Sequence, residues 1–139
     1  MNEAGVTRYW KLFLESNQPK DTECYELKLV NLEKTKSFAF DRVADHQVDA
    51  LLASLEGFWY KIVDSAAING FSAKKPFDAI WIKAKEAYVV VIFYLPRRYK
   101  KALLIPVKDF VKIRDRWERK SIRMDELEQQ SGVSAILLH

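Results

Sequence analysis

The sequence predicts an α+β protein in which helices pack on a small mixed β-sheet. Segments with apolar residues at helical spacing are interspersed with short segments rich in β-branched and aromatic residues. Hydrophobic residues make up 49% of the 139 residues, which is enough to build a buried core. The length fits one compact domain, and no repeat or linker divides the chain, so we expect a single domain over residues 1–139.

Two helices and two strands are expected in the N-terminal half. Apolar spacing predicts helices over residues 7–16 and 42–55. Thr7 and Asp41 are the expected N-caps of these helices. Gly57 is expected to end the second helix, because glycine commonly follows the last helical residue. The expected strands cover residues 23–30 and 58–63.

The C-terminal half is expected to begin with a β-hairpin. Two strand-like segments, residues 77–83 and 88–94, are joined by the short segment 84–87, which is the spacing of a hairpin. A basic turn at residues 96–101 follows. The remaining expected elements are a strand over residues 102–107 and helices over residues 108–117 and 124–130, with Ser121 as a cap for the last helix.

The composition and the N-terminal sequence indicate the cellular compartment. The single cysteine, Cys24, excludes an internal disulfide, and the N-terminus lacks a signal-peptide pattern. The longest apolar run, residues 87–95, is too short to span a bilayer. We therefore expect a cytoplasmic protein with no membrane partner.

Charge is spread unevenly along the chain. The formal net charge is +4, but acidic side chains outnumber basic ones in residues 1–70 and the reverse holds in residues 71–139. A basic half is typical of a protein that binds a polyanion, and equally of an ordinary solvated surface. If the partner is DNA, the basic turn supplies phosphate contacts that do not depend on sequence. The residues expected to make them are Arg97, Arg98, Lys100 and Lys101.

A Glu-x-Lys triplet in the first expected strand is a candidate metal-binding and catalytic site. Side chains alternate along a strand, so Glu26 and Lys28 point to one face while Tyr25, Leu27 and Leu29 point to the other. A glutamate there can hold a divalent metal beside the ammonium group of the lysine. Such a triplet is common on exposed strands, and its meaning depends on what surrounds it.

Gln47 is the second informative residue. It lies four residues after Val43 and four before Leu51, which places an amide on the helix face that should be buried. One interpretation is that the amide satisfies nearby backbone groups. The interpretation that we favour is that the helix crosses the strand of Lys28, so that Gln47 positions the lysine, a metal-bound water or a phosphate.

Asp78 is the preferred second metal ligand. Phosphodiester hydrolysis with a bound metal needs hard oxygen ligands, and Glu26 supplies only one side chain. Asp78 follows Pro76 at a strand start, and Lys74 and Lys75 beside it suit a phosphate. The alternative is that Asp78 is an ordinary polar residue at that position. Other carboxylates, which we expect to be solvated or capping residues, are Glu15, Asp21 and Asp64.

The order of several short motifs resembles one nuclease family. The segments are Tyr25-Glu26-Leu27-Lys28, Ser37-Phe38-Ala39-Phe40 and Asp45-His46-Gln47. They are similar to the core of RecU-type Holliday-junction resolvases, which belong to the PD-(D/E)XK nuclease superfamily. The resemblance covers residues 23–63 well and residues 102–128 loosely.

The resemblance implies a restriction-endonuclease-like sheet flanked by helices. It also implies an Mg²⁺-dependent endonuclease for branched or structured DNA, with Mn²⁺ expected to substitute. Matching positions make Glu26 a metal ligand, Lys28 the catalytic lysine and Gln47 a site residue. A junction cutter makes two symmetric incisions, so a homodimer is expected. The setting would be the cytoplasm of a bacterium or a phage-infected cell.

One departure from the family concerns the missing aspartate. In the family an aspartate precedes the Glu-x-Lys triplet on a neighbouring strand, whereas here the segment Lys75-Pro76-Phe77-Asp78 follows it. We therefore expect a permuted order in which Asp78 meets Glu26 in space. Two rival functions remain. The chain is either a catalytically inactive nucleic-acid-binding module or a subunit of a larger complex, with an interface at Trp59, Tyr60 and Trp81.

Overall fold

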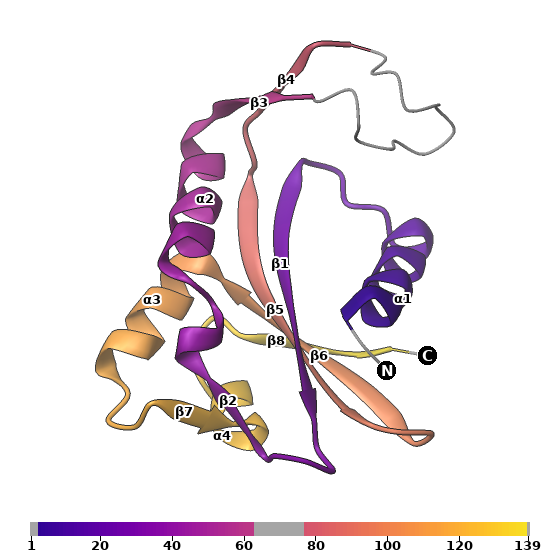
Figure 1. Ribbon diagram of the computed structural model, residues 1–139, viewed down its shortest axis with the longest axis vertical. Coiled ribbons are helices and arrows are strands. Elements are labelled where there is room, and N and C mark those ends of the chain that lie inside the picture. The colour runs from indigo at the N-terminus through magenta and orange to yellow at the C-terminus, as the bar shows by residue number, and fades with distance from the viewer. Residues whose placement is uncertain (1–2, 63–76, 139) are drawn as a thin grey trace.

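A four-stranded mixed sheet forms the centre of the protein. The structure, a computed structural model, describes residues 3–62 and 77–138 (Figure 1). The strand order is β1-β5-β6-β8. β1 (Glu23–Asn31) runs parallel to β5 (Glu86–Leu95), which pairs antiparallel with β6 (Tyr99–Pro106). β6 in turn pairs antiparallel with β8 (Ser134–Leu138), a strand that the sequence did not predict.

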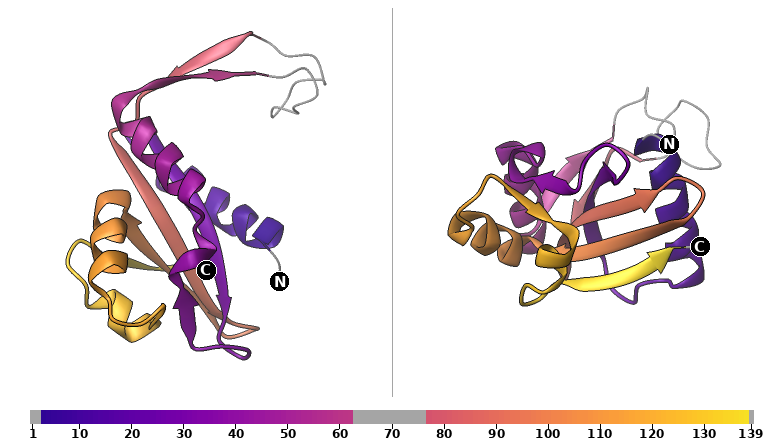
Figure 2. Two further views of the ribbon diagram at one scale, coloured as in Figure 1. Left: turned by 60° about the vertical axis from the view of Figure 1, so that its left-hand side comes forward. Right: turned by 90° about the horizontal axis from the view of Figure 1, so that it is seen from below.

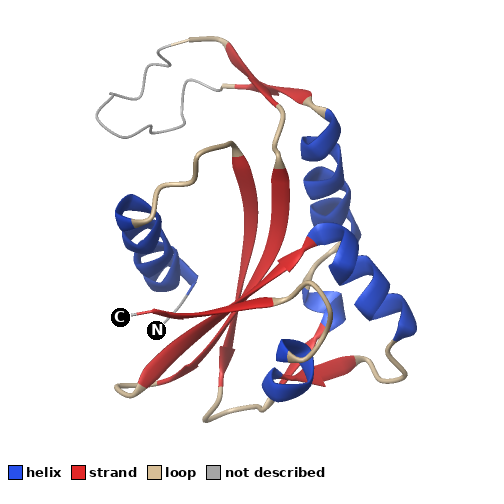
Figure 3. Ribbon diagram, turned by 180° about the vertical axis from the view of Figure 1, so that it is seen from behind, coloured by secondary structure: helices blue, strands red, loops and turns tan. Residues whose placement is uncertain are grey.

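Helices cover both faces of this sheet (Figures 1 and 3). On one face, α1 (Glu3–Ser16) packs Trp10 against Val90 and Ile92 of β5. On the other face, α2 (Asp45–Glu56) and α3 (Val107–Arg116) pack against the alternate residues of the same strand, such as Val89 and Val91. β5 is therefore buried on both sides, which explains its continuous apolar run. The mixed α+β class is confirmed.

The connection from β1 to β5 has to cross over, because parallel neighbours cannot be joined by a tight turn. The chain passes through β2 (Ser37–Ala39) and a short 3₁₀ helix, η1 (Phe40–Arg42), before α2. β2 pairs antiparallel with β7 (Ser121–Arg123), which leads into α4 (Met124–Glu128). This route lays α2 across the face of β1 and β5.

A second two-stranded sheet replaces the expected hairpin. β4 (Ala79–Ile82) pairs antiparallel with β3 (Phe58–Lys61), and this ribbon reaches beyond the end of the central sheet (Figure 2). The predicted pairing of residues 77–83 with residues 88–94 is wrong. The segment between them does not turn back, because the Ala84 amide donates to the Ser54 carbonyl and the Lys85 amide to the Thr22 carbonyl. These bonds carry the chain from the ribbon into the central sheet.

The helix caps also differ from expectation. Thr7 lies inside α1, and Asp41 lies in η1, so α2 begins later than predicted. Ser121 lies in β7, and Arg123 occupies the N-cap position of α4. Gly57 does end α2, with a φ of 104°. Among the described residues, no helix is both long and apolar enough to cross a membrane.

Candidate functional site

The strand alternation predicted for β1 is confirmed. Tyr25, Leu27 and Leu29 pack with Trp10 on the face that α1 covers. Glu26 lies on the opposite face, where it contacts α2. The Glu-x-Lys triplet therefore lies under the helix that follows it in the sequence.

Gln47 fixes one oxygen of Glu26. Its amide nitrogen Nε2 donates a hydrogen bond of 2.9 Å to Glu26 Oε1. Its amide oxygen accepts a 2.9 Å hydrogen bond from the backbone N–H of Ala44, the N-cap residue of α2. The two bonds set the orientation of the amide. Gln47 thus both caps its own helix and reaches the triplet, which combines the two interpretations of this residue.

Lys28 completes a three-residue cluster, which we call the Glu26 cluster (Glu26, Lys28 and Gln47). Lys28 Nζ lies 3.4 Å from Glu26 Oε1, and the side chains of Lys28 and Glu26 are 12% and 29% exposed. Both contacts to the carboxylate end on Oε1, and within the described residues Oε2 has no hydrogen-bond partner. One oxygen is held in place, and the other remains able to bind a ligand.

The cluster lies on an edge strand of the sheet. Next to it, the guanidinium of Arg42 donates a hydrogen bond to the carbonyl of Leu29. Carbonyls alternate in direction along a strand, so the Leu27 carbonyl points to the same edge as that of Leu29. The sequence did not single out Arg42. Its one signal is a basic residue just before the helix that carries Gln47.

Asp78 is not brought to Glu26. It directly precedes β4, is exposed, and its carbonyl accepts a hydrogen bond from the Ile62 amide. It therefore lies in the β3–β4 ribbon, whereas Glu26 lies in the central sheet opposite Val89 of β5. The physical reason is the pairing of β4 with β3, which takes Asp78 towards the far end of the ribbon.

The predicted phosphate contacts divide into three groups. Lys74 and Lys75 lie outside the described residues. Arg97 and Arg98 are exposed in the turn between β5 and β6. Lys100 Nζ lies 4.2 Å from the centre of the Tyr9 ring, and Lys101 Nζ lies 2.7 Å from a carboxylate oxygen of Glu128. Lys100 and Lys101 are therefore occupied by contacts within the protein.

The residues present fit a divalent ion only in part. Across residues 3–62 and 77–138, no three or more His, Cys, Asp or Glu side chains come together as a metal site. The Glu26 cluster offers one carboxylate oxygen and, on the same strand, the Leu27 carbonyl. Hard cations take oxygen ligands and often retain several waters, so most of the remaining ligands would have to come from water or from a bound ligand.

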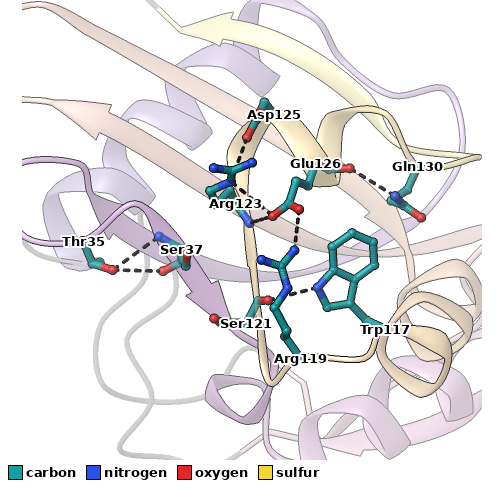
Figure 4. A network of polar contacts seen from close by, with 9 residues as sticks. All are labelled: Thr35, Ser37, Trp117, Arg119, Ser121, Arg123, Asp125, Glu126 and Gln130. Atoms are coloured by element: carbon teal, nitrogen blue, oxygen red, sulfur yellow. Dashed lines mark hydrogen bonds and ion pairs between the residues drawn. The ribbon is translucent and has the colours of Figure 1, made fainter.

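Polar contacts order the segment from Arg119 to Gln130, which includes β7 and α4. Figure 4 shows Glu126 accepting hydrogen bonds from Arg119 and from the backbone N–H of Arg123, the latter at 3.1 Å. The Arg123 hydrogen bond, followed by the contact with Arg119, lowers the pKa of the Glu126 carboxyl. These contacts order β7, which pairs with β2. Beside this pairing, the Phe40 amide donates a 3.0 Å hydrogen bond to the Lys120 carbonyl. The network thus holds the segment that leads to Arg42 and α2.

The aromatic residues of the ribbon are exposed. Trp59 is 69% exposed and Trp81 is 51% exposed, with their ring centres 5.4 Å apart. Strand aromatics usually belong to a core, and these do not. Their exposure agrees with a surface that contacts another molecule.

Comparisons with known proteins give no match: no family model, no curated protein and no solved structure resembles this chain closely enough to be identified as a relative.

Proposed function

We propose that this protein is a metal-dependent endodeoxyribonuclease that acts on branched or structured DNA, in the manner of RecU-type Holliday-junction resolvases. The proposal includes a restriction-endonuclease-like arrangement of the PD-(D/E)XK superfamily. The observation that carries it is the convergence of Glu26, Lys28 and Gln47 from two separate elements. The same three residues carry the sequence resemblance.

Each residue of the Glu26 cluster has a role that follows from its geometry. Glu26 Oε2 and the Leu27 carbonyl would hold Mg²⁺ or Mn²⁺, which when bound polarises the scissile phosphate and lowers the pKa of a coordinated water. Lys28, whose side chain is mostly buried beside Glu26, would place a positive charge where negative charge develops during attack on phosphorus. Gln47 keeps the carboxylate from rotating.

DNA would approach along the open edge of β1. Arg42 lies at that edge, and its charge can pair with a phosphate next to the one being cleaved. Arg97 and Arg98 supply further phosphate contacts from the β5–β6 turn. Lys74 and Lys75 keep the phosphate-binding role that the sequence predicts for them.

A second candidate function is a nucleic-acid-binding module without catalytic activity. The specific observation in its favour is that the Glu26 cluster contains one carboxylate, and Asp78 lies in another sheet. In this case the basic surface binds DNA, and Glu26 and Lys28 form only a structural ion pair.

One experiment separates the two functions. A labelled four-way junction and a linear duplex are incubated with the protein in Mg²⁺, Mn²⁺ or EDTA, and binding in EDTA is followed by gel shift. We expect metal-dependent nicking, stronger on the junction, that is lost in Lys28→Ala while binding persists. Binding without any nicking supports the second function. If the protein neither binds nor nicks the DNA, both proposed functions are contradicted.

A further inference from the structure

The exposed large apolar side chains gather in two places. One is the β3–β4 ribbon, and the other is the α1–β8 groove, a hollow of about 310 Å³ between the helix and the last strand. Leu12 on α1 is 50% exposed and Leu137 on β8 is 57% exposed. Large apolar side chains gathered in this way mark a surface that contacts another molecule. The apolar residues that line the groove are Tyr9, Leu12, Phe13, Leu137 and Leu138.

β8 borders this groove and is an unprotected sheet edge. Within residues 3–62 and 77–138, β8 pairs with β6 on one side and with no strand on the other (Figure 2, where β8 is the yellow strand). Its sequence, Ser-Ala-Ile-Leu-Leu, contains no charge and no proline. Exposed edges of this kind readily pair with another strand, and proteins usually guard them with charged side chains.

The opposite edge of the same sheet is guarded. β1 carries Glu23, Glu26 and Lys28, and Arg42 occupies the carbonyl of Leu29. The contrast indicates that the β8 edge, and not the β1 edge, is the one that takes a further strand.

We propose that the β8 edge and the α1–β8 groove bind an extended, acidic peptide segment of another protein, which adds a strand to the sheet beside β8. Backbone hydrogen bonds along β8 would hold the main chain of the peptide, and the surfaces beside the edge would select its alternate side chains. Ile136 and Leu138 pack on the face that α1 covers, and alternation puts Leu137 on the other face. An added strand would therefore set one row of side chains beside the groove and the other beside Leu137, so apolar residues suit both rows.

The charges around the groove favour a partner that carries carboxylates. Arg8 and Lys11 are exposed on α1 and, together with Glu15, line a second hollow that adjoins the groove. On the groove wall, Lys100 Nζ lies 4.2 Å from the centre of the Tyr9 ring. Among the described residues, three cationic side chains thus border the two hollows against the one carboxylate of Glu15. An aspartate or glutamate next to the apolar core of the peptide would complement this excess of positive charge.

Other occupants fit this surface less well. A second copy of the chain would bring an uncharged β8 and another α1 with the same excess of cations, Arg8 and Lys11 against Glu15, so like charges would meet. DNA offers phosphates to the cations, but it does not pair with the backbone of β8 and leaves the exposed leucines uncovered. An extended peptide satisfies the backbone edge, the apolar side chains and the charges together.

This inference goes beyond the proposed nuclease function and does not depend on it. The test below measures peptide binding and no DNA cleavage, so failure of the peptide site and failure of the nuclease activity are distinguishable.

The test pans a phage-displayed library of random linear peptides on the immobilised full chain. The enriched peptides are expected to share a short apolar, β-branched segment without proline, with aspartate or glutamate beside it. One enriched peptide, labelled with a fluorophore, is then titrated by fluorescence anisotropy. Its dissociation constant should rise at least about tenfold in Leu12→Glu and in Leu137→Lys, because each places a charge against the apolar core of the peptide. Ile80→Lys, on the ribbon, is the matched control and should bind as tightly as wild type.

Backbone methylation distinguishes an added strand from other modes of binding. Successive N–H groups of a strand point to opposite sides, so only every second one of the peptide would pair with β8. N-methylation of one alternate set of peptide nitrogens should abolish binding, and N-methylation of the other set should leave binding nearly unchanged.

A charge swap tests the acidic character of the partner. The double variant Arg8→Glu/Lys11→Glu should bind the acidic peptide more weakly than wild type does. The same peptide with lysine in place of its acidic residues should show the reverse preference.

Four results would overturn the proposal. They are a library in which no peptide is enriched, leucine variants that bind the peptide as wild type does, an equal effect of methylation on both sets of nitrogens, and an unchanged preference in the charge swap. Self-association through β8, seen in sedimentation equilibrium as a dimer of wild type that Leu137→Lys dissociates, would also overturn it. All substituted residues are exposed, and circular dichroism checks that each variant folds.

Discussion

Gln47 links the stability of α2 to the geometry of Glu26. Its two hydrogen bonds, to Glu26 Oε1 and from the Ala44 amide, join the first turn of a helix to a strand residue 21 positions earlier. Lys28 Nζ contacts the same oxygen, so two groups together limit the rotation of the Glu26 carboxylate. Limited rotation favours binding of a metal or a water in one place.

Gln47→Ala should lower both stability and activity. The Ala44 amide loses its partner, and loss of a hydrogen bond of this kind costs about 1–2 kcal/mol. Urea unfolding measures the stability, and nicking of a four-way junction measures the activity. Gln130→Ala is the control, because Gln130 also donates one side-chain hydrogen bond, to the Glu126 carbonyl, but lies outside the cluster. Equal activity in the two variants would remove Gln47 from the site.

Glu126 should make stability dependent on pH. Hydrogen bonds from Arg123 and Arg119 lower its pKa in the folded state, so folding favours the ionised form. This contribution is fully present above the carboxyl pKa of the unfolded chain and is lost as pH falls through the folded-state value. Glu126→Gln should therefore be less stable than wild type at neutral pH, with the gap closing in acid. Urea unfolding between neutral and acidic pH measures the gap, with the exposed Glu118→Gln as control.

At the scale of elements, α2 positions the cluster and Gly57 allows the chain to leave α2. Gly57 has a φ of 104°, where side chains other than glycine are strained. A Cβ atom built at this position would lie 2.5 Å from Cζ2 of Trp81. The ribbon thus packs a tryptophan on the end of the helix that carries Gln47.

Gly57→Ala should destabilise the protein by about 1–3 kcal/mol, because it combines backbone strain with the clash against Trp81. In the double variant Gly57→Ala/Trp81→Ala the clash is absent and only the strain remains. Thermal or urea unfolding of the two single variants and the double variant separates these contributions. If the losses in unfolding free energy of the two single variants add up to the loss in the double variant, the close approach of Trp81 does not contribute to the cost of Gly57→Ala.

The strand that carries Glu26 and the helix that carries Gln47 were predictable because short-range patterns decide them, whereas the parallel pairing of β1 with β5 was not predicted. Alternation placed Glu26 and Lys28 on one face, and helical spacing turned Gln47 towards them. The pairing of β4 was not predictable, since residues 77–83 lie much closer in sequence to the next strand, β5, than to β3, and long-range packing nevertheless pairs β4 with β3. Arg42 was missed because its contact depends on β1 lying at an edge, which only the strand order reveals.

At the scale of the whole molecule, the basic half of the chain should bind DNA mainly through its charge. The logarithm of the DNA association constant should fall linearly with the logarithm of the salt concentration. Each phosphate contact contributes about one to the magnitude of that slope. Replacing both Arg97 and Arg98 by alanine should therefore reduce the slope by about 2 in fluorescence-anisotropy titrations.

Lys101→Ala is the control for this measurement, because Lys101 already pairs with Glu128. It should change the slope little. A loss in Lys101→Ala as large as in the double arginine variant would mean that the β5–β6 turn is not the DNA contact.

The most direct test of the proposed nuclease site compares two glutamates on one strand. Glu23 lies three residues before Glu26 on the opposite face of β1, where it accepts a hydrogen bond from Tyr25. Junction nicking in saturating Mg²⁺ should fall at least about a hundredfold in Glu26→Gln, the order lost when a group that stabilises the transition state is removed. It should remain near wild type in Glu23→Gln. Equal rates in the two variants would contradict the assignment of Glu26 as the residue on which cleavage depends.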